Sequence, residues 1–224
     1  MKKIVTSVIM LVLLDCSVYA QNDFKLNKIN ASNIPTLSED IGVRPALIPE
    51  LLSKTTKIKD AGDVYEYPVR PGTEEWKALN GYQAMLSACL VPEQILQKMS
   101  TIGLIDTVLD YPLFSNVWWS RNNIQQGFEH MVSEFNGVRE LFKRRDAGAL
   151  LLAKYLGTDP AGFKKGASLE ERDNYVMLLQ EVEILLAQDA VQAGLTESQR
   201  AELKKLAFAK YEVKKTLEDY GTLD

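Results

Sequence analysis

His130 and Glu134 come nearest, by residue type and spacing, to a chemical site. They lie four positions apart in a segment with helical periodicity, so both side chains fall on one face and could hold a metal ion. A zinc site needs a third protein ligand, and His130 is the only histidine in the chain. The segment also lacks the His-Glu-x-x-His order of zinc hydrolases. The sequence therefore predicts no metal site and no cofactor, and it predicts an exposed or interhelical His130.

Two further pairs have the residue types of catalytic pairs. Asp106 and Asp110 lie one helical turn apart, a spacing that suits a general acid and a general base. The apolar residues between them occupy the other side of the helix, which indicates that the two aspartates form a solvated polar face. Cys89 and His130 could form a thiol nucleophile and its base. However, Cys89 lies in the apolar run "YQAMLSACLVP", where a thiol usually packs in the core.

Motifs of several other function classes are missing from the sequence. No serine stands in a Gly-x-Ser-x-Gly turn, and no glycine-rich segment leads into the Lys-Ser/Thr of a phosphate loop. The net charge is −4, and the lysines and arginines are scattered along the chain. This distribution gives no electrostatic footprint for nucleic acid.

An aromatic group ends the stretch "MSTIGLIDTVLDYPLFSNVWW", and "RNNIQQGFEH" after it adds amides and a guanidinium. Adjacent tryptophans point in different directions on any regular element, so at least one could anchor a partner or a sugar-like ligand. The alternative, which the sequence favours for the tryptophans, is that both fill a gap between two helices. The candidate ligand or partner surface comprises Tyr111, Phe114, Trp118, Trp119, Arg121, Asn122 and Gln125.

The first 20 residues have the pattern of a secretory signal peptide. Two lysines precede an apolar run that is too short to span a membrane, and small residues precede Gln21. We expect cleavage after Ala20 and export to the periplasm or the medium. The alternative is a lipoprotein signal with Cys16 as the lipidated residue, although Asp15 stands where such signals usually have a small residue. Cleavage leaves Cys89 as the single cysteine, so the exported chain cannot form an internal disulfide, and no later apolar run is long enough for a transmembrane segment.

Residues 21–72 differ in composition from the rest of the chain. Prolines are spread through polar stretches with only short apolar groups, a pattern that forbids long helices and favours extended backbone. We expect an extended, partly disordered arm. The predicted organisation is thus a signal peptide at 1–20, the arm at 21–72 and a helical domain at 73–224.

Helical signals dominate from Thr73 onward. Thr73 and Asp146 are placed to cap helices, Asn122 and Asn123 can cap the long one, and Ser168 with Glu171 and Thr196 with Gln199 form capping boxes. Pro112 should end the helix that contains the two aspartates. The expected helices span residues 73–89, with breaks allowed, 93–99, 102–110, 122–144, 147–156, 169–194 and 197–220.

Strand patterns are poor throughout, so the predicted fold class is all-α. Short connections allow a multi-helix orthogonal bundle or a short armadillo- or HEAT-like stack of helix pairs, preceded by the Pro-rich arm. The segment "FNGVRELFKRRDAGALLLAKYLG" has the form of one such pair, but no 40-residue repeat recurs.

The phrases "YPVRPGTEEWKAL", "VPEQILQKMSTIGLIDTVLDYPLF" and "NNIQQGF…FNGVRELFKRRDAGALLLAKY" resemble an uncharacterised family of exported bacterial proteins of the Bacteroidetes type. The resemblance covers about residues 67–156. It implies export, and it implies that this block is the functional unit. It implies no activity and assigns no catalytic residue.

The sequence favours a non-catalytic, exported helical protein that binds a protein or a small polar ligand in the cell envelope. The missing metal set, nucleophile–base pair and phosphate loop point away from an enzyme without excluding one. The alternative is a small periplasmic or secreted hydrolase that uses scattered carboxylates such as Glu75, Asp106 and Glu134. The oligomeric state is left open.

Overall fold

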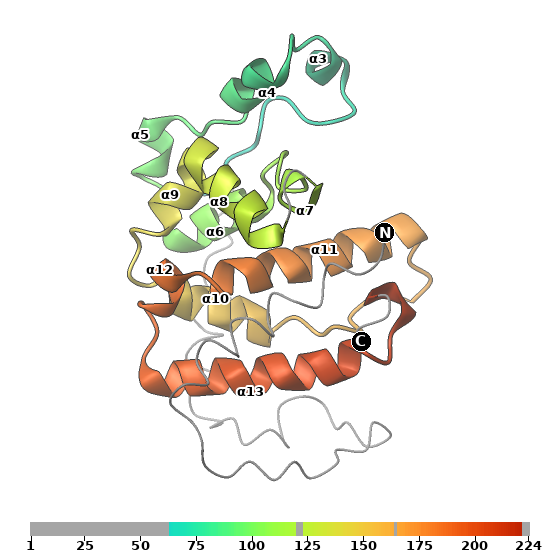
Figure 1. Cartoon of the computed structure of the whole chain (residues 1–224). Coiled ribbons are helices and arrows are strands. Elements are labelled where there is room, and N and C mark those ends of the chain that lie inside the picture. The colour runs from blue at the N-terminus through green and yellow to red at the C-terminus, as the bar shows by residue number, and fades with distance from the viewer. Residues whose placement is uncertain (1–62, 120–122, 164, 221–224) are drawn as a thin grey trace.

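The computed structural model describes residues 63–119, 123–163 and 165–220, and every regular element in these ranges is a helix (Figure 1). The predicted all-α class is confirmed for this part of the chain. The predicted signal peptide and most of the predicted arm lie outside the described residues.

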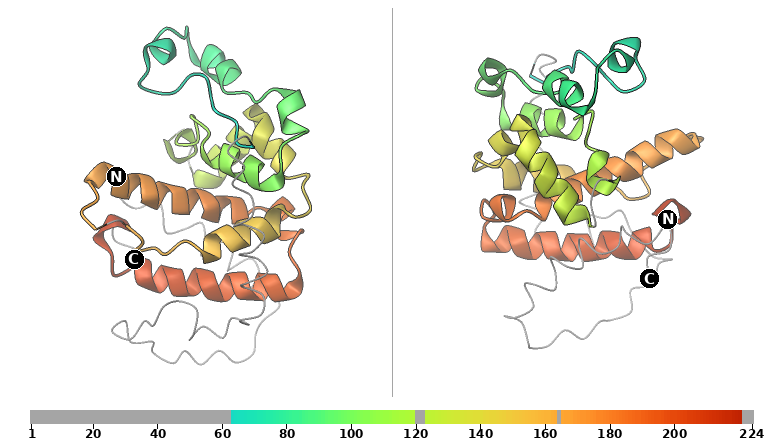
Figure 2. Two further views of the ribbon diagram at one scale, coloured as in Figure 1. Left: turned by 180° about the vertical axis from the view of Figure 1, so that it is seen from behind. Right: turned by 45° about the horizontal axis from the view of Figure 1, so that its top comes forward.

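Three helices are stacked in the lower half of the molecule in Figure 1, namely α11 (Leu169–Leu186), α10 (Ala147–Leu156) and α13 (Glu197–Lys214). The shorter α10 packs against both long helices, and the view from behind shows it between them (Figure 2). α12 (Asp189–Gln192) connects α11 to α13, and the 3-10 turn η3 (Glu218–Tyr220) returns from α13 to α11.

The upper half is built around α6 (Thr101–Leu109), which contacts α9 (Asn136–Leu141) and reaches down to α10 and α11. α8 (Ile124–Glu134) packs against α7 (Asn116–Trp119) on one side and α9 on the other. At the end away from α13 lie three short helices (Figure 1): α3 (Glu74–Lys77), α4 (Tyr82–Ala88) and α5 (Glu93–Leu96).

One continuous hydrophobic core joins the two halves. Cys89, Phe128 and Leu152 are among its fully buried side chains. Burial raises the pKa of the Cys89 thiol to about 11, so the thiol stays protonated at neutral pH and packs as an apolar group. None of the helices in the described ranges is long and apolar enough to cross a membrane.

Residues 63–70, here called the strap, run along α6 without forming a helix. The strap begins where the Asp63 carboxylate accepts the backbone N–H of Ser100, at 2.9 Å, at the start of α6. Only glycine fits beneath this crossing, because a Cβ on Gly103 would lie 2.2 Å from the Asp63 carbonyl oxygen. Hydrogen bonds of Tyr65 and Tyr67 with Thr107 and an ion pair of Arg70 with Asp110 hold the remainder.

Several predicted helix starts are confirmed by their hydrogen bonds. The Thr73 hydroxyl accepts the Trp76 N–H, and the Asn123 side chain accepts the Gln126 N–H. Both predicted capping boxes form with both of their hydrogen bonds: Ser168 with Glu171 and Thr196 with Gln199. Asp146 stands at the predicted N-cap position of α10, but its side chain makes no capping hydrogen bond, because its carboxylate accepts the hydroxyl of Thr101 instead.

The predicted single helix over 122–144 is wrong, because Phe135 interrupts it in an extended conformation with ψ 119°. The break lets the Phe135 ring stack on Tyr111 at 3.9 Å between ring centroids. The Arg139 guanidinium then donates to the carbonyls of Val132 and Ser133, which the end of α8 leaves free. The apolar periodicity resumes one residue after the break, so the sequence pattern alone predicts one continuous helix.

The predicted helix over residues 169–194 is also wrong in its length, because α11 ends at Leu186. Gln188 is extended, and its side-chain amide donates to the Ile184 carbonyl near the end of α11. The chain then starts the separate helix α12.

Candidate functional site

α7 and α8 meet in a close backbone approach at Gly127. A Cβ at this position would lie 2.1 Å from the carbonyl oxygen of Val117, so a glycine is required for the two helices to touch. This contact places the polar side chain of Asn116, at the start of α7, next to the face of α8 that carries His130 and Glu134.

A hollow of about 210 Å³, counting the space open to solvent, lies at this junction. It is shallow and suits one small polar group rather than a whole cofactor. Its walls come from α4, from the turn after α6, and from α7 and α8. The lining residues are Tyr82, Tyr111, Leu113, Asn116, Val117, Gly127, His130, Met131 and Glu134.

The Glu134 carboxylate is the centre of the polar groups in the hollow. One of its oxygens accepts the Tyr82 hydroxyl at 2.8 Å, and the other lies 3.3 Å from His130 Nε2. Tyr82 is 52 residues away along the chain, so only the fold could reveal this contact. The i, i+4 spacing of His130 and Glu134 therefore produces a side-chain pair. The residues that the structure describes contain no group of three potential metal ligands around it.

The two tryptophans of α7 have different environments. Trp119 is 72% exposed, whereas Trp118 packs against the core. The Trp118 indole N–H is buried and finds no hydrogen-bond partner in the described part of the chain. The gap-filling interpretation thus fits Trp118, and the alternative of an exposed anchor fits Trp119. Of the residues of α7, Asn116 and Val117 line the hollow, whereas Trp119, three positions after Asn116, does not.

No family model, curated protein or solved structure matches this chain. Its function must therefore be inferred from the geometry of the site itself.

The other residues of the predicted surface are only partly brought to the hollow. Tyr111 lines it but is 5% exposed, and Phe114 is core at 2%. Burial raises the pKa of the Tyr111 phenol, which keeps the hydroxyl neutral. Gln125 is exposed on α8 and exchanges hydrogen bonds with Gln188 of the lower half. Arg121 and Asn122 lie outside the described residues.

The carboxylates of the hydrolase alternative do not meet. Glu75 is exposed on α3, and Asp106 pairs with Lys154 at 2.8 Å. Only Glu134 lines the hollow. Asp110 likewise has its own partner, because its carboxylate forms a bidentate ion pair with Arg70 of the strap. The two aspartates that share a face of α6 thus anchor two different elements.

Sequence reasoning missed the buried ionisable groups of the lower half. Glu183, 8% exposed, accepts both the Tyr155 hydroxyl and the ammonium of Lys214. Lys210 is fully buried and donates to the Thr158 carbonyl. Burial lowers the pKa of Lys210 to about 8. The only sequence signal was the i, i+4 spacing of two lysines on a helix, which is usually a solvated face.

Proposed function

We propose that the protein is an exported, non-catalytic binding protein, and that its recognition surface lies on α7 and α8, which carry the exposed Trp119 and part of the lining of the hollow. The observation that carries the proposal is the 72% exposure of Trp119 on α7, the helix whose first residue, Asn116, lines the hollow. Large exposed aromatic side chains next to polar groups are frequent anchors of binding surfaces.

The surroundings of Trp119 support its role as a contact residue. Its neighbour Trp118 and the nearby Phe114 pack into the core, so the local fold does not need the exposed indole of Trp119 for its stability. The polar side chains of the hollow are positioned by helices α7 and α8 and not by long loops. A ligand therefore meets groups whose directions are already set, which lowers the entropy cost of binding.

The separate partners of Asp106 and Glu134 support binding over hydrolysis. Paired acid and base groups must both reach the same reacting atom. Export remains part of the proposal and rests on the signal-peptide pattern of residues 1–20.

Paired variants of two equally exposed apolar residues test the proposal. Trp119 and Leu169 are both 72% exposed, but Trp119 is on α7, which contributes to the lining of the hollow, whereas Leu169 lies at the start of α11, which contributes none of it. The exported chain is titrated with envelope glycans, peptidoglycan fragments and peptides, and any bound member is incubated to detect turnover. We expect Trp119→Ala to weaken binding by about tenfold or more and Leu169→Ala to leave it unchanged. Equal binding by wild type and Trp119→Ala, or turnover of the bound molecule, contradicts the proposal.

A further inference from the structure

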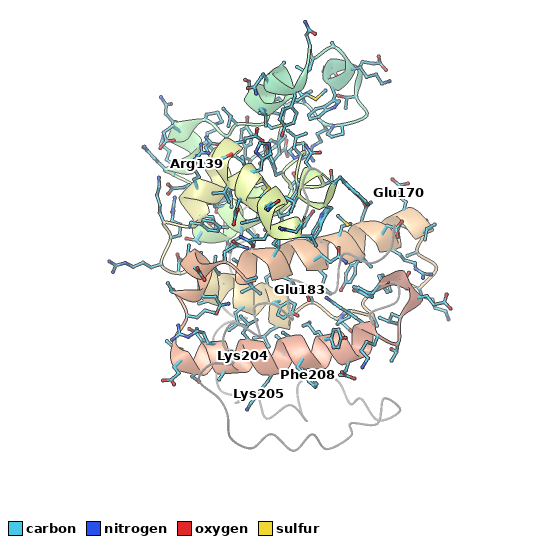
Figure 3. All side chains as sticks on the ribbon, in the orientation of Figure 1. Arg139, Glu170, Glu183, Lys204, Lys205 and Phe208 are labelled. Carbon is cyan, nitrogen blue, oxygen red and sulfur yellow. The ribbon has the colours of Figure 1, made fainter. Side chains whose placement is uncertain are left out.

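The Glu134 carboxylate lies at the surface in the hollow but is largely enclosed, and it has no lysine or arginine beside it. Its side chain is 17% exposed, and its only ion-pair partner within the described ranges is His130, whose Nε2 lies 3.3 Å from one carboxylate oxygen. An imidazole compensates a negative charge only while it is protonated. Arg139 of α9, which Figure 3 labels, donates to the carbonyls of Val132 and Ser133 instead.

Other carboxylates with little exposed surface and an ion pair, in the part of the chain that the structure describes, have a lysine or an arginine as partner. Glu183 pairs with Lys214, and Asp219 pairs with Arg172, with each acid 8% exposed. Enclosing a negative charge is costly unless a positive charge or hydrogen bonds compensate it. The carboxylate in the hollow differs from these two, because a positive charge stands beside it only when the imidazole is protonated.

The remaining walls of the hollow suit an alkyl chain that ends in a cation. Leu113, Val117 and Met131 line it with apolar side chains, and the aromatic residues Tyr82 and Tyr111 are also part of its lining. Aromatic rings attract cations at their faces. A space of about 210 Å³, open to solvent, admits the end of one side chain. The hollow therefore combines apolar contacts for methylene groups with a carboxylate for the charge at their end.

Other classes of ligand match this lining less well. An anion would be repelled by the carboxylate. A metal ion would find too few ligands, since the described residues contain no group of three that could hold one. Among organic cations, an ammonium is compact and has three N–H donors, whereas a guanidinium is planar and wider. A primary amine is thus the cation that suits the hollow best.

We infer that the hollow binds a primary ammonium group on an alkyl chain, with the Glu134 carboxylate as its anionic partner, and that protonation of His130 competes with this binding. The inference rests on the proposed function, because it names the ligand class of the same recognition surface. The ammonium group can belong to a lysine side chain of a partner protein or to a small free amine, and the experiment distinguishes these two sources.

The competition gives binding a pH dependence of defined sign. A histidine changes charge between about pH 5 and pH 8. Protonated His130 supplies a positive charge beside Glu134 and repels a second cation, so affinity should fall as pH falls. The other titratable groups of the lining are the phenols of Tyr82 and Tyr111, a class that ordinarily titrates near pH 10, and Arg139 of the neighbouring α9 stays charged throughout. By linkage, a bound ammonium should also displace the proton from the imidazole.

The experiment titrates the exported chain, without a histidine tag, with n-butylamine and with a short blocked peptide that contains one lysine. The same peptide with norleucine in place of lysine keeps the alkyl stem and removes the charge. Calorimetry at constant ionic strength gives the affinities at pH 8 and at pH 5.5. The NMR signals of His130, the only histidine in the chain, report its protonation.

We expect the amines to bind at least about tenfold more tightly at pH 8 than at pH 5.5, and the norleucine peptide to bind at least about tenfold more weakly than the lysine peptide at pH 8. At about pH 6.5, added amine should shift the imidazole signals toward the neutral form. Tighter binding of the lysine peptide than of butylamine identifies a partner protein as the source, and equal binding identifies a free amine.

Matched variants assign the binding to the carboxylate. Glu134→Gln should weaken amine binding by about tenfold or more at pH 8. Glutamine still accepts the Tyr82 hydroxyl, so the melting temperature should stay near that of wild type. Glu129→Gln makes the same charge change at an exposed position of α8 outside the lining and should leave binding unchanged. His130→Gln should keep binding at pH 8 and remove most of the difference between the two pH values.

The outcomes separate the inference from the proposed function. If no amine binds, if Glu134→Gln and Glu129→Gln bind amine equally, or if affinity rises as pH falls, the ammonium inference is overturned. The binding function still stands in that case when another ligand loses affinity in Trp119→Ala. If no ligand of any class, amines included, binds through α7 or α8, both are overturned. Amine binding that is lost in Glu134→Gln and weakened at pH 5.5 supports the inference.

Discussion

At the scale of single residues, Glu181 shows what burial does to a carboxylate without a hydrogen bond. It is 9% exposed on α11, and no hydrogen bond to it is present within the described ranges. Burial raises its pKa to about 8, and the negative charge of Asp110 adds to the shift. Glu134, by contrast, is held by two polar neighbours at the protein surface. The buried position of Glu181 thus makes its ionised form costly to stability, whereas the surface position of Glu134 suits it to bind a ligand.

The raised pKa of Glu181 predicts a pH-dependent stability. The native state keeps the proton up to about pH 8, whereas the carboxyl of the unfolded chain releases it near its ordinary pKa of 4.5. Because the native state binds more protons over this window, stability falls as pH rises through it, by roughly 3 kcal/mol between pH 5 and pH 8. Glu181→Gln should remove this contribution and raise the free energy of unfolding at pH 7. Urea unfolding of both proteins at several pH values measures it, and identical pH slopes would refute the assignment.

The two tryptophans give a second prediction at this scale. Trp118→Ala removes a ring packed against the core and should cost about 2–4 kcal/mol of unfolding free energy. Trp119→Ala removes an exposed ring and should change stability by no more than about 0.5 kcal/mol. Thermal unfolding of the two variants makes the comparison, which fails if Trp119→Ala is the more destabilised protein.

At the scale of elements, the site depends on how closely α7 approaches α8. The two helices touch at Gly127, and the four residues of α7 carry both Asn116 and Trp119. So short a helix has no stability of its own, and the contact with α8 must hold it in place. Any side chain at position 127 would therefore move the recognition surface.

Gly127→Ala tests this dependence, and Gly157→Ala is its matched control. An added Cβ at Gly127 would lie 2.1 Å from a backbone oxygen, which cannot move without shifting α7. At Gly157 the nearest atoms are 3.7 Å away. We expect the first variant to lose about 2–3 kcal/mol of stability and to change Trp119 emission. The second should be neutral or gain about 0.4–1 kcal/mol. Chemical unfolding and fluorescence supply both readouts, and equal stability of the two variants would contradict the packing argument.

Elements with local signals were predictable from the sequence, whereas their interruptions were not. The capping boxes at Ser168 and Thr196 involve residues three positions apart, so the sequence contains all of their information. The break at Phe135 depends on a stacking partner, Tyr111, that lies 24 positions away in the chain. For the site, the sequence supplied the aromatic group and the spacing of His130 and Glu134. The hydrogen bond from Tyr82 to Glu134 could not be predicted from the sequence, because only the fold brings these two residues together.

At the scale of the whole molecule, one carboxylate connects the three stacked helices of the lower half. Glu183 projects from α11 into the space above α13, where Figure 3 labels it. It accepts the hydroxyl of Tyr155 from α10 and the ammonium of Lys214 from α13. Lys210 lies in the same region, with its ammonium 4.7 Å from the centre of the Tyr155 ring. Two buried cations therefore share the field of a single anion.

This arrangement predicts that Glu183→Gln is costly but that the cost depends on pH. Removing the charge leaves Lys214 and Lys210 buried without their anion, which should cost about 3–5 kcal/mol at pH 7. In the wild-type protein, the Glu183 charge raises the pKa of Lys210. Loss of this charge in Glu183→Gln therefore lowers the pKa of Lys210 below about 8. The native variant then binds fewer protons than the unfolded chain, whose lysines titrate near 10.5, and its stability should rise with pH over that window.

A double variant separates the interaction energy of the Glu183–Lys214 pair from the effect of each single substitution. In Glu183→Gln with Lys214→Met, one cation is removed and glutamine still accepts the Tyr155 hydroxyl, so much of the lost stability should return. Chemical unfolding of wild type, both single variants and the double variant, at pH 7 and pH 9, yields the coupling energy of the pair at each pH. Additive losses at both values would mean that Glu183 does not hold the layers together through Lys214. Non-additive losses, with the double variant more stable than the sum of the two single losses predicts, are the result expected if the buried ammonium of Lys214 needs the Glu183 carboxylate beside it.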